Sequence, residues 1–138
     1  MLFTGDALIP SEWYSTMIGV FQDATKYIQS LEKISKMDVN TLCPGHEPIR
    51  ERSEVQREIK THIERYLDIE RNLIQILSES GGMTLWEIYR QLADKLLAPG
   101  NHAPGIGGLM TLRGFLNKLS FEGKIAQDNG STWRGVMR

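Results

Sequence analysis

LCPGH at residues 42–46 and LFTGD at residues 2–6 decide the fold of this chain. In each stretch a short apolar run, typical of a buried strand, meets a glycine and then a side chain that can bind a metal ion. Between them, apolar residues recur at steps of three and four over residues 16–36, the pattern of an amphipathic helix. We therefore expect a strand, a helix and a second strand, at residues 39–43, in one α/β layer.

A much longer helix is expected after the second strand. Ser53 and Gln56 have the spacing of a capping box, and the apolar stripe behind them continues to Gly81-Gly82. About 26 helical residues span roughly 40 Å. Such a helix can pack on one unit with its first half and on another with its second. We therefore divide the chain into residues 1–52, a connector helix at 53–80, and a second unit at 81–138.

The second unit has the element order of a winged-helix domain. Thr84 and Glu87 form another capping box, which predicts a helix over residues 85–97. A Gly/Pro-rich loop at 99–108 precedes a helix with leucines at 109, 112, 116 and 119, and Gly123 suits the left-handed position just after it. Residues 124–128 and 131–136 flank Asn129-Gly130, a strong hairpin signal. We expect helix, helix, helix and hairpin.

Asp6 and His46 are the candidate metal ligands. A carboxylate oxygen and a neutral imidazole both bind Zn²⁺ or Mn²⁺, and a carboxylate can bridge two ions. Gly-Asp and Pro-Gly-His are nevertheless short patterns. On their own they fit a capping or turn aspartate and a surface histidine better than a metal site.

The order of residues 2–8, the helix and residues 42–49 resembles the second half of the metallo-β-lactamase fold. The resemblance implies that Asp6 bridges two metal ions and that His46 binds one of them. Together with the connector and the unit ending near residues 121–125, the chain resembles the lactamase-associated winged-helix subgroup, which includes endoribonuclease-like and thioesterase-like hydrolases. The implied fold class is α+β: a remnant α/β layer of short strands and a helix, joined by a long helix to a winged-helix domain.

Two departures from the family pattern limit the implied activity. The His-x-His-x-Asp-His motif is absent, since the three histidines are His46, His62 and His102, and we interpret the last two as structural. Glu47 stands where the family usually has glycine, and we assign it no role.

Cys43 imitates half of a structural zinc site, but we expect it to face the sheet interior without a partner pair. A productive site needs about three protein ligands, so we name no catalytic residue and expect neither zinc nor manganese, the family's metals, to bind stably here.

The resemblance implies the C-terminal portion of a metal-dependent hydrolase that cleaves an ester, thioester or phosphodiester bond with a metal-bound hydroxide. We expect this chain to be inactive in isolation. The alternative is a non-catalytic winged-helix module that binds nucleic acid or a protein partner. Residues 81–138 hold seven Lys and Arg against four Asp and Glu, a net +3, and the candidate nucleic-acid contacts are Arg113, Lys118, Lys124 and Arg134.

Composition favours a cytoplasmic protein. Cys43 is the single cysteine, the net charge is −1, and no apolar stretch approaches the roughly 20 residues of a membrane helix. The N-terminus has no signal-peptide pattern, and we expect no membrane partner. Half a sheet leaves an open edge, so a homo-oligomer is a further expectation.

Overall fold

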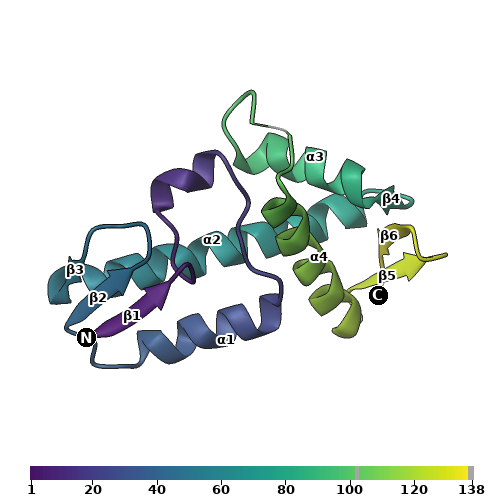
Figure 1. The fold of residues 1–138 in the computed structure, drawn as a ribbon. Coiled ribbons are helices and arrows are strands. Elements are labelled where there is room, and N and C mark those ends of the chain that lie inside the picture. Colours follow the sequence, from purple (N-terminus) through teal and green to yellow (C-terminus); the bar gives the residue numbers. More distant parts are fainter. Residues whose placement is uncertain (102, 137–138) are drawn as a thin grey trace.

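The computed structural model describes residues 1–101 and 103–136, so the interpretation of His102 lies outside the described residues. Helix α2 runs along the molecule, with a small sheet and α1 at one end and α3, α4 and a second sheet at the other (Figure 1). In chain order the elements are β1 (Leu2–Gly5), the 3₁₀ helix η1 (Ser11–Ser15), α1 (Ala24–Ser35), β2 (Thr41–Pro44), β3 (Arg50–Glu51), α2 (Arg52–Ser78), β4 (Met83–Thr84), α3 (Leu85–Leu96), α4 (Ile106–Phe121), β5 (Ile125–Asp128) and β6 (Thr132–Gly135).

The first sheet has the order β1-β2-β3 and confirms the predicted strand, helix and strand. β1 pairs parallel with β2, with Leu2 opposite Leu42, and β2 pairs antiparallel with β3. α1 and the first half of α2 pack on this sheet through one apolar cluster, which consists of Leu8, Leu31, Val39, Leu42, Val55 and Ile59. Because β1 and β2 are parallel neighbours, the residues that follow them meet at one edge of the sheet.

The second half of α2 belongs to another apolar cluster. It is shared with α3, α4 and the sheet β4-β6-β5, and its largest members include Tyr66, Tyr89, Phe115 and Trp133. The Thr84–Glu87 capping box is present as predicted. Asn129 and Gly130 have φ of 50° and 73°, as a two-residue hairpin turn requires, and Gly123 has the expected left-handed φ of 70°.

Several predicted helix boundaries are wrong. α1 begins at Ala24 instead of near residue 16, because the Asp23 side chain caps it by accepting from Lys26 N at 2.9 Å. α2 begins at Arg52 behind Glu51, so Ser53 lies inside the first turn and does not cap. α4 begins at Ile106, within the predicted loop.

Residues 16–23, predicted as the first turns of α1, instead cross over to α4. Phe21 N donates to the Thr111 hydroxyl at 3.0 Å, and Gly19 packs so closely on Thr111 that a Cβ there would lie 3.1 Å from its methyl group. This segment therefore joins the N-terminal layer to the C-terminal elements. Among the residues that the structure describes, no helix combines the length and apolarity of a membrane span.

Candidate functional site

Asp6 and His46 lie side by side where β1 and β2 end. Asp6 Oδ1 is 3.1 Å from His46 Nε2, and the side chains are 71% and 54% exposed. The Trp13 ring from η1 lies beside the imidazole, with ring centroids 5.6 Å apart. The two residues singled out from the sequence thus form one solvent-accessible pair.

Two glycines bring this pair together. Gly5 has a left-handed φ of 50°, and its carbonyl accepts from Gly45 N at 2.9 Å. A Cβ on Gly45 would lie 2.8 Å from Asp6 Oδ1 and 3.1 Å from the Gly5 carbonyl carbon, closer than real side chains approach. The left-handed backbone at Gly5 and the close packing at Gly45 therefore explain why glycine precedes each candidate ligand.

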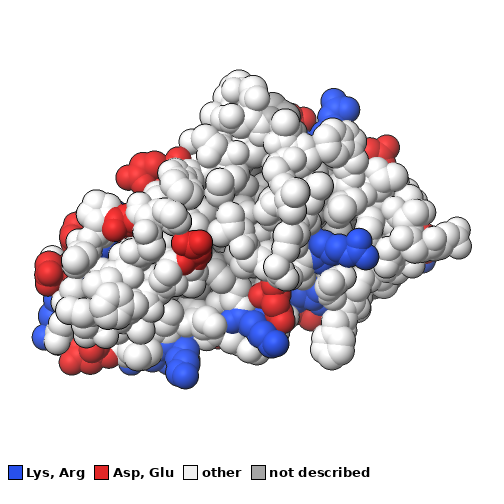
Figure 2. All heavy atoms as spheres, viewed as in Figure 1, with Lys and Arg blue, Asp and Glu red and all other residues white. Residues whose placement is uncertain are grey.

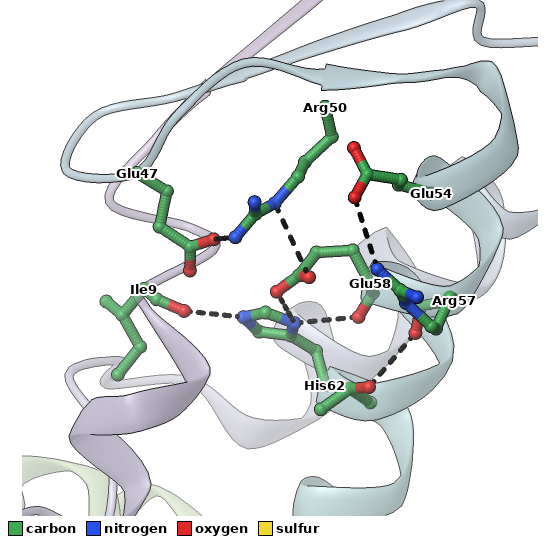
Figure 3. Close-up of polar contacts among 8 residues, drawn as sticks. Ile9, Glu47, Arg50, Glu54, Arg57, Glu58 and His62 are labelled. Atoms are coloured by element: carbon green, nitrogen blue, oxygen red, sulfur yellow. Dashed lines mark hydrogen bonds and ion pairs between the residues drawn. The ribbon is translucent and has the colours of Figure 1, made fainter.

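Glu47, which follows His46, turns into the protein. Its carboxylate is only 2% exposed and accepts from Arg50 Nη2 at 2.7 Å (Figure 3). This hydrogen bond raises the pKa of Arg50 above its usual value, so the guanidinium stays charged. The sequence left open whether Glu47 narrows the mouth of the site or points to solvent, and in the structure it does neither.

Glu58 and His62 extend this cluster along α2. Arg50 Nε lies 3.7 Å from Glu58 Oε2. Burial, and then repulsion from Glu47, raise the pKa of Glu58 against the opposing effects of His62 and Arg50. His62 is fully buried, with Nδ1 2.9 Å from the Glu58 carbonyl oxygen and Nε2 3.0 Å from that of Ile9 (Figure 3). His62 thus has the structural role predicted for it.

Sequence reasoning missed Glu47, Arg50 and Glu58 as buried groups. One signal was present: Glu58 and His62 are four residues apart, beside the apolar positions 55, 59 and 66 of α2. Cys43 was predicted to face the sheet interior, but it is only half-buried, and its neighbour Leu42 fills that interior.

Comparison with known proteins shows which proteins the region around the Asp6–His46 pair resembles. Residues 1–46, which include both Asp6 and His46, match the family model described as the metallo-beta-lactamase superfamily. The Beta-lactamase-like protein 2 homolog of Caenorhabditis elegans is 25% identical over 135 residues. These matches support membership of the metallo-beta-lactamase superfamily. The aligned region covers 98% of this chain and 42% of that relative, so the chain spans less than half of its length.

Two solved structures share the fold of this chain. The metallo-beta-lactamase family protein of Thermus thermophilus superposes with a TM-score of 0.68 at 18% identity, over 96% of this chain and 40% of that one. The beta-lactamase domain protein of Burkholderia ambifaria gives a TM-score of 0.64 at 17% identity, over 97% and 41%. Nearly the whole chain therefore superposes on part of each of these two structures.

The Asp6–His46 pair suits the metal ions that the superfamily resemblance implies. Two ligand atoms about 2.0–2.2 Å from a tetrahedral ion are separated by roughly 3.3–3.6 Å, and the observed separation is slightly shorter, at 3.1 Å. Within residues 1–101 and 103–136, however, no group of three or more His, Cys, Asp or Glu side chains could hold a metal ion. The pair fits part of a ligand set.

A cavity of about 290 Å³ opens beside Asp6. Its walls are mainly apolar and include Ile9, Ile18, Phe21 and Ile69. Arg65 also lines it, anchored by Nη2, which donates to the Tyr14 carbonyl at 2.9 Å and to the Met17 carbonyl at 3.1 Å. The cavity can accommodate a small apolar group next to the candidate ligand.

The four candidate nucleic-acid contacts do not form one basic surface. Lys118 and Lys124 both pair with Glu70 and Glu122, and Arg134 pairs with Asp128 at 2.8 Å. For Arg113, the described part of the chain contains no ion pair. Figure 2 shows basic and acidic side chains interspersed on the face in view. Most of this positive charge is neutralised locally.

Proposed function

We propose that this chain contributes Asp6 and His46 to the metal site of a hydrolase that cleaves an ester, thioester or phosphodiester bond. One observation carries the proposal: the two side chains lie 3.1 Å apart and exposed, at the ends of adjacent parallel strands. The match of residues 1–46 to the superfamily model supports it.

A zinc or manganese ion, when bound, supplies a water of lowered pKa as nucleophile and polarises the bond to be cleaved. Asp6 provides the negative charge that offsets the ion, and His46 provides a neutral nitrogen donor from Nε2. The Trp13 ring lies beside the imidazole, with the ring centroids 5.6 Å apart. The adjacent cavity receives an apolar portion of the substrate, which favours an ester or thioester over a phosphodiester.

The isolated chain is inactive under this proposal, because a productive site needs about three protein ligands and one open position. Asp6 and His46 are two. The remaining ligands come from a segment carrying the His-x-His-x-Asp-His motif, which this sequence lacks. The C-terminal elements act as a winged-helix domain that positions the substrate or a partner subunit.

Metal content and hydrolysis test the proposal together. Mass spectrometry of the purified chain is expected to show no stoichiometric zinc or manganese, and ester and RNA substrates are expected to remain uncleaved. Zn²⁺ titrated into the chain should bind weakly and perturb the His46 ring resonances, an effect that Asp6→Asn removes and the distant Asp38→Asn leaves unchanged. Tight binding of two metal ions by this chain alone would overturn the proposal.

The alternative, a non-catalytic module of the C-terminal elements, has one observation in its favour. Phe121 at the end of α4 is 95% exposed, and large exposed apolar side chains are typical of protein contacts. Because three of the four candidate cations are paired, a protein partner is favoured over nucleic acid within this alternative. Binding to duplex DNA or RNA that weakens steeply with salt would reverse that preference.

A further inference from the structure

The turn that carries His46 is tied to α2 through the residue next to it. Glu47 turns inward and accepts from Arg50 at 2.7 Å, while Arg50 reaches Glu58 on α2 at 3.7 Å (Figure 3). Arg50 therefore connects Glu47, at the start of the turn, to the buried Glu58 carboxylate on α2. The turn has little freedom to move away from the helix.

The segment that follows Asp6 is tied to the same part of α2. Ile9, three residues beyond Asp6, presents its carbonyl oxygen to His62 Nε2 at 3.0 Å, and the other ring nitrogen is held at 2.9 Å from the Glu58 carbonyl (Figure 3). One turn of α2, residues 58–62, thus anchors the chain segments of both candidate ligands.

Stability alone does not account for this cluster. Burying charged groups carries a large desolvation cost, and well-packed apolar replacements of buried ion pairs are often neutral or stabilising. Among the described residues, Glu47 Oε1 and Glu58 Oε1 are buried without a hydrogen-bond partner, which adds to that cost. A glycine at position 47, which the family resemblance leads one to expect, would have no side chain to pair with Arg50.

We propose that Glu47 and Arg50, anchored by Glu58 and His62, are positioning residues that hold His46 against Asp6. Glu47 does so from inside the protein while His46 faces solvent. The metal-binding consequence rests on the proposed function, but the positioning is a property of the metal-free chain. The two are therefore measured separately.

Hydrogen exchange and NMR of the metal-free chain test the positioning. In Glu47→Gly and Arg50→Met, the Gly45 amide, which donates to Gly5 at 2.9 Å, is expected to exchange about tenfold faster, and the His46 ring shifts should approach those of an exposed histidine. Glu47→Gln, which keeps a hydrogen-bond acceptor for Arg50, should restore most of the protection. Asp38→Asn is the matched control, because it removes the exposed Arg52–Asp38 ion pair of 2.8 Å just outside the cluster.

The proposal would be overturned if Glu47→Gly and Arg50→Met both kept the Gly45 exchange rate and the His46 ring shifts of the wild type, with the fold intact by circular dichroism. Equal effects of Asp38→Asn would also overturn it. If the whole chain instead loosens in Glu47→Gly, so that Leu77 and Leu116 amides in the second cluster exchange faster by the same factor, the role is structural and the positioning role is refuted.

Zinc titration then tests the consequence for metal binding. A two-ligand site binds weakly, so the zinc affinity is followed through the His46 ring resonances. Glu47→Gly is expected to raise the dissociation constant for zinc about tenfold, which is the lower end of the effect of losing a residue that supports a metal ligand. Faster Gly45 exchange with an unchanged dissociation constant would overturn the link to the metal. If neither the wild type nor any variant binds zinc, but the Gly45 amide exchanges faster in the variants, the proposed function fails and the positioning role stands.

Discussion

Gly45 shows how closely the two candidate ligands constrain the backbone. In Gly45→Ala the new methyl group would lie 2.8 Å from Asp6 Oδ1, so the turn or the carboxylate must move. We expect a loss of about 2 kcal/mol in the free energy of unfolding, within the range for overpacking, and separation of the Asp6 and His46 side chains. Denaturant unfolding measures the first and NMR the second. Gly81→Ala is the control, because nothing lies within 4 Å of its Cβ position.

Glu58 makes the stability of the protein depend on pH. Its pKa is raised in the fold, chiefly by burial and then by Glu47, so the ionised form is less favourable there than in the unfolded chain. This cost is fully present above the raised pKa and disappears as the pH falls through it toward the ordinary glutamate value. We therefore expect the wild type to gain stability relative to Glu58→Gln on acidification over that window, measured by denaturant unfolding. A constant difference between the two proteins would contradict this assignment.

At the residue scale, the sequence could identify Asp6 and His46 but not the groups behind them. A motif after each strand predicts which side chains meet, because parallel neighbouring strands end at one edge. The inward turn of Glu47 depends on Arg50 and Glu58, and the pairing of these side chains arises only when β3 and α2 pack together. A charged residue in a loop predicts solvent exposure, and here that reading failed.

The observed helix boundaries show which capping patterns in the sequence form a cap in the folded structure and which do not. Thr84 caps α3, and its hydroxyl accepts from Glu87 N at 3.3 Å, whereas Ser53, which has a similar sequence pattern, makes no cap. We expect Thr84→Ala to lower the free energy of unfolding by about 1 kcal/mol, and Ser53→Ala to have little effect. Thermal or denaturant unfolding of both variants makes the comparison. Equal losses would show that Ser53 also caps.

The elements that local pattern predicted were those with an uninterrupted apolar period or a strong turn signal, such as α3, the hairpin and most of α2. Those it missed depend on distant partners. β3 and β4 have two residues each and exist because they pair with Thr41–Leu42 and with Thr132–Trp133. Residues 16–23 carry an apolar period yet are not helical, because Gly19 and Phe21 contact Thr111 on α4 instead.

At the scale of the whole molecule, α2 links two apolar clusters, with Val55 and Ile59 in one and Tyr66, Leu73 and Leu77 in the other. α1 also contributes to both, through Ala24 and Leu31. The two ends of the molecule are therefore not joined by the connector helix alone. The division of the chain into domains at residues 53–80 remains a prediction.

The edge of the first sheet gives the whole molecule a route to self-association. In the part of the chain that the structure describes, β1 is an edge strand, and its Phe3 is 75% exposed. An exposed apolar edge strand is a template for pairing with another chain. We expect concentration-dependent association by analytical ultracentrifugation, weakened in Phe3→Lys because lysine on an edge strand opposes pairing. Phe121→Lys, at the end of α4 and outside the first sheet, is the control. If Phe121→Lys disrupts association and Phe3→Lys does not, the contact lies on the C-terminal elements, and a strictly monomeric wild type at high concentration would exclude both surfaces.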